Sequence, residues 1–301
     1  MRNAERPAAP PRGLAAAVHA PASEARQALA SWCRARLRGD PGPSSLLVAA
    51  HPDDEVIGAG IRLLHVRRVT VLHATDGSPR NQRDARAAGC DSREAYTRLR
   101  RRELRVALQR RGLPPVRTRR LDLVDGEAAF GLVQLTRDLA ALFRVAAPAV
   151  VVTHPYEGGH PDHDAVAFAV HHACALLRDA GVRPPTLLEM TSYHGIAGQL
   201  RTGCFLPGGE PGVPVPHTAA EATRKREMLA CFVSQRRTLE PFEIVPERFR
   251  PAPAYDFSRP PCEGAPLYEL FGWGLTSGHW SELAAQARRE LGLTAAGGSP
   301  F

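Results

Sequence analysis

The 301-residue sequence contains no uninterrupted apolar run close to the ~18 residues that a membrane-spanning helix needs. The apolar stretch from Gly13 to His19 is too short and too broken to indicate a secretory signal peptide. Cysteine is also sparse, since six residues lie far apart with no C-x-x-C pair, and neither a disulfide framework nor a four-cysteine metal site is predicted. These absences favour a soluble, cytoplasmic protein with reduced thiols and no membrane span.

Lysine is nearly absent, because Lys225 is the single lysine among 39 basic residues, which face 31 acidic residues and give a formal net charge of +8. The excess lies in the segment from Arg98 to Arg120, which holds ten arginines and one acidic residue, Glu103. Aromatic residues make up only 6% of the chain, whereas a nucleic-acid-binding surface combines a basic face with a docking motif or stacking aromatics. We therefore expect a solvated helix face and no nucleic-acid partner.

Hydrophobic residues make up 44% of the chain, which is enough for a large buried core. Short apolar runs alternate with longer helical patterns, which is typical of βαβ units and predicts an α/β fold with a mostly parallel sheet and flanking helices. The predicted strands are Ser45–Ala50, Val69–Thr75, Val116–Leu121, Ala149–Thr153 and Thr186–Tyr193. The predicted helices are Val56–Val66, Arg93–Arg111, Phe130–Ala146, Asp162–Ala180 and Thr218–Val233, the last opening on a capping-box pattern.

Composition divides the chain into three parts. Residues 1–44 are rich in Ala, Pro and Arg and contain one predicted helix, Ser23–Arg38, so we expect an appended N-terminal arm. Residues 45–237 carry the alternating pattern of the α/β core. Residues 238–301 are Pro-rich and predict loops or small strands, then a short helix at Ser281–Leu291, packed on the core.

Metal-ligating residue types follow three of the predicted strands. Ala50-His-Pro-Asp-Asp-Glu55 follows the first strand, Thr75-Asp-Gly77 the second, and His154-Pro-Tyr-Glu-Gly-Gly-His-Pro-Asp-His163 the fourth. In an open α/β sheet, ligands bind beyond the carboxyl ends of the strands. The sequence therefore predicts that imidazoles and carboxylates from separate segments meet at one edge of the sheet.

A catalytic zinc site needs about three N or O ligands from the protein and a free position for water. His51, Asp54 and His163 meet that requirement, and the alternative that such histidines merely cap helices is less consistent with two motifs at two junctions. Asp53 is then free to act as a general base. His160 is a candidate cation or hydrogen-bond donor to an oxyanion. Asp162 either orients one of these histidines or is only a helix N-terminal acid.

Two of these segments, Ala50-His-Pro-Asp-Asp-Glu55 and His160-Pro-Asp-His163, resemble the motifs of the PIG-L/LmbE-like zinc-dependent N-deacetylases. Those enzymes remove acetyl groups from N-acetylglucosaminyl compounds and similar amides. Thr75–Gly77, the Arg100-x-x-Glu103 pair and the stretch from Lys225 to Gln235 also resemble the family, over roughly residues 45–237. The resemblance implies an LmbE-like, Rossmann-like fold. It also implies ligands at His51, Asp54 and His163, a base at Asp53 and a transition-state stabiliser at His160.

Other residues are candidates for substrate contact. At 100° per residue, Arg100 and Glu103 fall on the inward face of their helix, either as a buried ion pair or aimed at a ligand, and the resemblance favours substrate contact by Arg100. Asp76 and Asp125 follow strands and either bind sugar hydroxyls or cap turns. Tyr193 ends the fifth predicted strand and is expected to line the pocket.

The sequence also departs from the family pattern. Gly158-Gly159 precedes His160, where some members have a tyrosine, so that role is either absent or moved to Tyr156 or Tyr193. The expected activity is hydrolysis of an N-acetyl amide on a small amino sugar or glycoconjugate by zinc-activated water, with Fe²⁺ as the other possible cation.

Two other functions use the same features. His51, a carboxylate and His163 also match the 2-His-1-carboxylate triad of a non-haem Fe(II) oxygenase, although those enzymes usually have an all-β barrel around it. Alternatively, the arginine-rich segment binds polyanions and the protein is not an enzyme. Neither the exact substrate nor the oligomeric state follows from the sequence.

Overall fold

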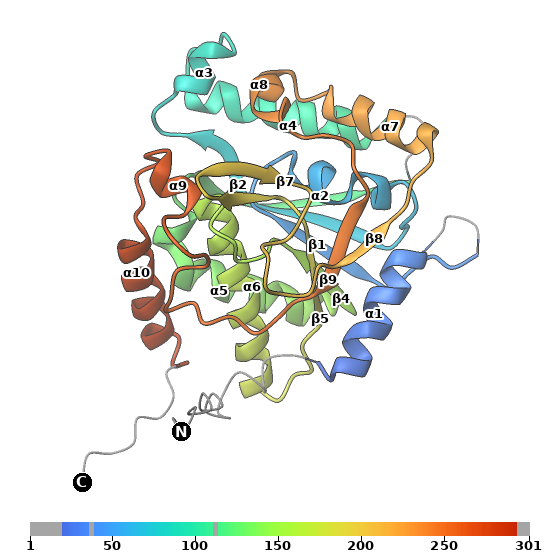
Figure 1. The fold of residues 1–301 in the computed structure, drawn as a ribbon, viewed down its shortest axis with the longest axis vertical. Helices are drawn as coiled ribbons and strands as arrows, with labels where there is room; N and C mark the ends of the chain where they lie inside the picture. The colour runs from blue at the N-terminus through green and yellow to red at the C-terminus, as the bar shows by residue number, and fades with distance from the viewer. Residues whose placement is uncertain (1–19, 36–38, 111–113, 294–301) are drawn as a thin grey trace, which may run out of the picture.

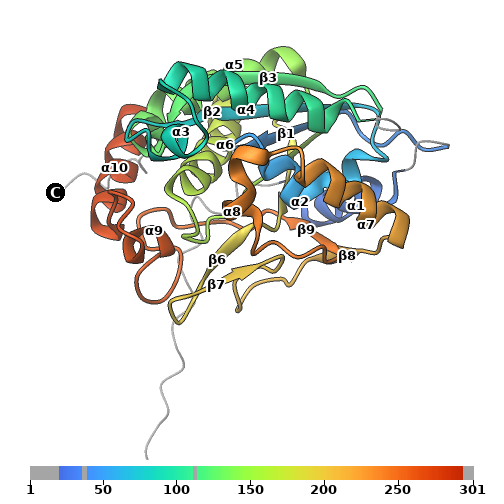
Figure 2. The ribbon, with the colours of Figure 1, turned by 90° about the horizontal axis from the view of Figure 1, so that it is seen from above.

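The computed structural model describes residues 20–35, 39–110 and 114–293. A seven-stranded sheet with the order β3-β2-β1-β4-β5-β9-β8 lies between two layers of helices (Figures 1 and 2). Its strands are β1 (Ser45–Ala49), β2 (Val69–Pro79), β3 (Arg117–Asp125), β4 (Val150–Thr153), β5 (Thr186–Met190), β8 (Val213–Val215) and β9 (Glu247–Pro251). A separate hairpin is formed by β6 (Tyr193–Ile196) and β7 (Gln199–Thr202).

The longer helices are α1 (Ala22–Arg34), α2 (Asp54–Leu63), α4 (Arg93–Leu108), α5 (Leu132–Ala146), α6 (Pro161–Asp179), α7 (Ala219–Leu229) and α10 (Ser277–Glu290). The short ones are α3 (Arg83–Ala87), α8 (Arg236–Leu239), α9 (Leu267–Leu270) and the 3₁₀ turns η2 (Ala128–Gly131) and η3 (Val233–Gln235). Within the described residues, no helix is long and apolar enough to cross a membrane. All six cysteines are free, as the sequence predicts.

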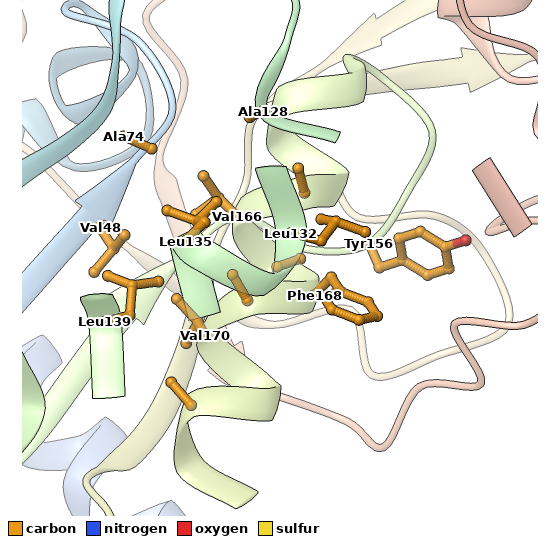
Figure 3. Close-up of a cluster of buried hydrophobic side chains, with 14 of the residues drawn as sticks. Val48, Ala74, Ala128, Leu132, Leu135, Leu139, Tyr156, Val166, Phe168 and Val170 are labelled. Carbon is orange, nitrogen blue, oxygen red and sulfur yellow. The ribbon is translucent and has the colours of Figure 1, made fainter. Parts of the chain in front are cut away.

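Strand β1 is buried on both faces of the sheet. Leu46 and Val48 point into the core beneath α5, α6 and α10, whereas Leu47 and Ala49 point into the core beneath α1, α2, α4 and α7. Figure 3 shows the first of these cores, where Leu135 and Leu139 of α5 pack near Val48. A strand covered on both faces has an apolar run rather than an alternating pattern. The carboxyl ends of the strands are therefore the edge where polar groups gather.

The parallel part of the sheet confirms the predicted α/β class. Strands β3, β2, β1, β4 and β5 are parallel neighbours, which is the Rossmann-like order. Strand β9 then pairs antiparallel with β5, and β8 with β9. For the region of β9 the sequence predicts only loops or small strands, and β8 is not among the predicted strands, because short strands with prolines in or beside them carry little periodic signal.

Three predicted boundaries differ at the strand ends. Strand β2 continues to Pro79, so Asp76 lies within the strand rather than after it, and β3 continues to Asp125. Strand β5 ends at Met190, and Tyr193 begins β6 in the hairpin instead of ending the fifth strand. Helix α4 ends at Leu108, before the predicted end. Both extended strands carry irregular register, which a periodicity argument does not detect.

Helix α1 is integrated into the core. Its Trp32 is fully buried, packs edge-on against Phe249 of β9 and lies beneath the guanidinium of Arg62. Arg62 in turn donates to the carbonyl of Trp32 at 2.7 Å. Of the predicted helix Ser23–Arg38, the last three residues lie outside the described residues. The division into parts 1–44, 45–237 and 238–301 stays a prediction, but α1 and β9 both extend the same core.

A buried carboxylate from β9 supports helix α2. Helix α2 is kinked at Ala59, where φ is −143° and ψ is 16°. Glu247 accepts from the N–H groups of Ile61 and Arg62 at 2.7 and 3.0 Å, and from the ammonium of Lys225 at 2.8 Å. The Glu247 carboxylate and the Lys225 ammonium are both buried, so each is the counterion that compensates the buried charge of the other.

We expect Glu247→Ala to lower the free energy of unfolding by about 3–5 kcal/mol, since it leaves the Lys225 ammonium buried without its counterion. Urea denaturation followed by circular dichroism measures the change, with the exposed Glu263→Ala as the matched control. A loss below ~1 kcal/mol, the size expected of an exposed pair, would contradict this account.

Candidate metal centre

The first group of site residues lies where β1 enters α2. His51 follows the strand, and Asp54 is the first residue of the helix. The N–H of His51 donates to Oδ2 of Asp54 at 2.8 Å, which folds the turn onto that carboxylate. Between them, Asp53 has a φ of 132°, a left-handed conformation that few residues other than glycine adopt. Such strain is maintained only where surrounding contacts fix it, and it concentrates at functional sites.

The second group lies at the N-terminus of α6. His160 is the N-cap, and its ring accepts from the N–H of Asp162, while Pro161 occupies the first helical position. This arrangement places His163 in the first turn, at the same sheet edge as β1. The helix is buried along nearly its whole length, so its first turn is rigidly held.

The structure brings His51, Asp54 and His163 together. One donor atom from each lies within 4.8 Å of the others, and all three residues are buried. Oδ1 of Asp54 is 3.2 Å from Nε2 of His163, and its Oδ2 is 3.2 Å from Nδ1 of His51. Nε2 of His163 is a buried atom with no hydrogen-bond partner among the described residues. A His₂Asp donor set of this kind fits a divalent cation with open coordination positions.

Protonation of two of these groups also suits a cation. Burial lowers the pKa of His163 to about 4, so its imidazole is neutral. Burial alone would raise the pKa of Asp54, but the neighbouring His163 and His154 rings outweigh it, and the pKa lies well below its usual range. Metal ligands must be deprotonated, and both of these groups are.

The other side of the His51 ring faces carboxylates. Nε2 is 3.0 Å from Oδ2 of Asp162 and 3.3 Å from Oδ1 of Asp125. Asp162 is fully buried and also accepts from the N–H groups of Gly126 and Ala128 at 2.7 and 3.0 Å. His51, Asp125, His160 and Asp162 also lie close enough to hold an ion. Because an imidazole that ligates a metal usually donates its other N–H to a carboxylate, we read this second group as the support of His51.

Asp53 is not one of the three donors and instead contacts Arg100. The Arg100 guanidinium lies 3.3 Å from Oδ2 of Asp53 and donates to the carbonyl of Pro52 at 2.6 Å. The N–H of Asp53 donates to Oε2 of Glu55 at 3.0 Å. Burial raises the pKa of Asp53 to about 7, and Arg100 opposes that rise. Asp53 is thus a buried carboxylate next to the cluster but outside its donor set.

The tautomer of His160 follows from its contacts. Its Nδ1 accepts from the N–H of Asp162 at 3.1 Å, so the proton of a neutral ring lies on Nε2. Burial lowers the pKa of His160 to about 3, which keeps the ring neutral. Of the two forms that the sequence left open, the structure favours the neutral hydrogen-bond donor over the cation. The ring stands edge-on to that of His51, with the centroids 4.5 Å apart.

Comparison with protein families matches residues 46–174 to PIG-L, GlcNAc-PI de-N-acetylase. The segment contains both histidine motifs and four strands of the parallel sheet. The match is shorter than the residues 45–237 over which the resemblance was expected.

A curated relative and two solved structures are also similar to this chain. A probable N-acetyl-alpha-D-glucosaminyl L-malate deacetylase of Bacillus cereus is 33% identical over 132 residues, which are 42% of this chain and 59% of that protein. The chain thus matches less than two thirds of that relative's length. A deacetylase of the teicoplanin biosynthesis pathway has a TM-score of 0.52 at 19% identity, over 69% of this chain and 96% of its own.

A deacetylase of an antimicrobial pseudoaglycone has a TM-score of 0.53 at 21% identity, over 71% of this chain and 98% of its own. At such identities these two structures establish the shared fold alone. They confirm the α/β architecture with a mostly parallel sheet that the PIG-L resemblance implies.

The glycines before His160, where the sequence departs from the PIG-L pattern, have a structural reason. A Cβ on Gly159 would lie 2.0 Å from the carbonyl oxygen of Tyr193, so only glycine allows β6 to pack this closely. Tyr193 is thereby placed with its ring 5.1 Å from that of His163. Tyr156 instead packs in the core and donates to the carbonyl of Arg259 at 2.8 Å. Of the two tyrosines considered, Tyr193 is the one beside the centre.

Arg100 and Glu103 are both buried on the inward face of α4, as predicted, but they serve different partners. Glu103 accepts from the N–H and the hydroxyl of Ser234 at 2.8 and 2.6 Å, which joins α4 to η3. Arg100 pairs with Asp53, so the two do not form the ion pair that the sequence allowed.

Asp76 is turned toward α4. Its carboxylate accepts from Arg93, from the N–H of Ser78 at 3.0 Å and from the hydroxyl of Thr97 at 3.3 Å. These contacts link β2 to α4 and give Asp76 a structural role. The contact of Asp76 with a sugar hydroxyl stays a prediction. Asp125, by contrast, lies against His51 and is partly exposed.

Two supporting residues were not predicted. Glu55 is fully buried and bonds both the N–H of Asp53 and Nε2 of His73, the latter at 2.9 Å. His154 stacks on His163 with ring centroids 3.9 Å apart, and its Nε2 accepts from the N–H of Ala50 at 3.0 Å. Both lie within the sequence motifs, but spacing alone does not distinguish a residue that holds a ligand from one that is a ligand.

Proposed function

We propose that the protein is a metal-dependent hydrolase that removes the N-acetyl group from an amino sugar or glycoconjugate. The observation that carries the proposal is the buried His51, Asp54 and His163 group with Asp53 beside it, within the PIG-L segment. The Bacillus cereus relative, which is a probable deacetylase of an N-acetylglucosaminyl compound, supports the same reaction class.

His51, Asp54 and His163 would hold the cation, which we propose to be Zn²⁺, with Fe²⁺ as the other candidate. When bound, such a cation lowers the pKa of water to about 7 and polarises a carbonyl oxygen. His51 is oriented for this by Asp162 and Asp125, and His163 by the His154 ring stacked on it.

Asp53 is the proposed general base. It is buried next to the donor group without belonging to it, and its backbone N–H is held by Glu55. Arg100 holds one carboxylate oxygen, Oδ2, and Oδ1 would then be the atom that takes the proton from water. The proton that Asp53 takes from water is then available to the leaving amine.

His160 is the proposed hydrogen-bond donor to the oxyanion of the tetrahedral intermediate. Its Nδ1 is occupied by the N–H of Asp162, and its Nε2–H remains for the substrate. Tyr193, on the other side of His163, is a second candidate donor. Arg100 and Asp125 are proposed to contribute to substrate positioning through Asp53 and His51.

The decisive test is an acetate-release assay over N-acetylated glucosamine conjugates, with metal-free protein and with added zinc. We expect release that depends on the metal and not on oxygen. Oxygen uptake with 2-oxoglutarate would instead support the iron oxygenase, and the α/β sheet in place of a β-barrel speaks against that outcome. A purified protein that binds no divalent metal and cleaves no amide would overturn the proposal and favour the polyanion binder.

A further inference from the structure

Three large apolar side chains are exposed at the end of α9 and in the turn that follows it. Leu270, Phe271 and Trp273 have exposed fractions of 52%, 51% and 42%. We call residues 270–273 the apolar turn. The segment 270–275 contains no charged residue. An apolar group of this size on the surface of a protein commonly marks a binding site.

The apolar turn lies beside the metal centre. The ring centroid of Trp273 is 5.0 Å from that of His160, and the ring of Phe271 is 5.4 Å from that of Trp273. His160 and Asp125 are the partly exposed members of the site, whereas His51, Asp54 and His163 are buried. A substrate that reaches the cluster on the His160 side therefore passes next to Trp273.

The backbone holds the turn in place. Leu267 and Tyr268 of α9 are fully buried, and the N–H of Leu267 donates to the carbonyl of Gly158 at 2.9 Å, in the loop that leads to His160. The N–H of Trp273 donates to the carbonyl of Tyr268 at 2.9 Å, and Gly272 has a φ of 64°, which closes the turn. The exposed rings are thus presented by an anchored segment.

We infer that the apolar turn is a binding subsite for an apolar aglycone, an aromatic or alkyl group attached to the N-acetylated sugar. The inference rests on the proposed function. With the acetamido group at the metal centre, a substituent on the sugar would lie over Trp273 and cover Phe271 and Leu270. A free sugar gains nothing from Leu270 and Phe271, whereas an apolar substituent removes both from water.

The test compares phenyl N-acetylglucosaminide with free N-acetylglucosamine. We expect Trp273→Ala to lower the ratio of their kcat/KM values by about tenfold, mainly through the KM of the phenyl compound, and Trp273→Phe to retain most of it. Val145→Ala, which removes an exposed apolar side chain at the end of α5, is the control and should leave the ratio unchanged.

A second readout needs no turnover. Trp32 and Trp280 are fully buried, so Trp273 is the exposed one of the three tryptophans. Fluorescence quenching by phenyl N-acetylglucosaminide therefore reports on the turn. Quenching that is equal in wild type and Trp273→Ala, or an equal loss of kcat for both substrates, would overturn the subsite. Absence of acetate release from every conjugate would overturn the proposed function, while the quenching result would still decide the subsite.

Discussion

Replacing Asp53 by Asn is expected to lower the kcat of acetate release by about 10²- to 10⁴-fold, the usual contribution of a general base. The change keeps the size of the side chain, and asparagine tolerates the positive φ at this position better than most residues. The metal should remain bound, because Asp53 is outside the donor set of His51, Asp54 and His163.

Kinetics of acetate release and elemental analysis of the purified variant measure the two effects separately. Asp179→Asn, at the exposed end of α6, is the matched control and should change neither. Turnover retained by Asp53→Asn would remove Asp53 from the mechanism. Loss of the metal together with turnover would show that Asp53 supports the site instead of acting as a base.

Replacing His163 by Ala is expected to reduce zinc affinity by more than about 100-fold. Removal of a residue that only supports a ligand lowers metal affinity by at most about 100-fold, and the loss of a ligand should cost more. Acetate release should be lost with it. The cause is local, since His163 supplies one of three donor atoms and the remaining His51 and Asp54 cannot enclose a cation.

Zinc titration by calorimetry measures this loss directly and does not depend on the substrate. His279→Ala, an exposed histidine on α10, serves as the control. If His163→Ala bound zinc as tightly as the wild type, the cation would have to be held elsewhere. The second group of His51, Asp125, His160 and Asp162 would then be the place to look.

Much of the fold and the location of the centre were predictable from the sequence for a simple reason. In a parallel sheet with both faces buried, the polar residues that follow the strands can only meet at the carboxyl edge. The motif around His51 and the motif around His163 follow neighbouring strands β1 and β4, so their junctions are adjacent in space. The inward face of α4 was equally predictable, because helical periodicity alone places Arg100 and Glu103 there.

The sequence could not predict the partners of those side chains. Arg100 and Glu103 are three residues apart and of opposite charge, which favours a local pair, yet packing offers Arg100 the carboxylate of Asp53 and gives Glu103 the N–H of Ser234. Likewise, nothing in the C-terminal sequence indicates that Glu247 supports a kinked helix nearly two hundred residues earlier. Such choices depend on which groups come within about 3 Å of one another.

The sequence by itself determined the class of fold, the edge of the sheet at which the site lies and the residue types gathered there, since these follow from strand order and side-chain chemistry. Only the tertiary structure decided that Nε2 of His51 lies against Asp162 and Asp125, and that His160 carries its proton on Nε2. The positions of Tyr193 and Trp273 beside the centre were likewise decided only there. These depend on contacts between segments far apart in the chain, and hydrogen bonds and ring packing are specified by positions in space, which no local pattern encodes.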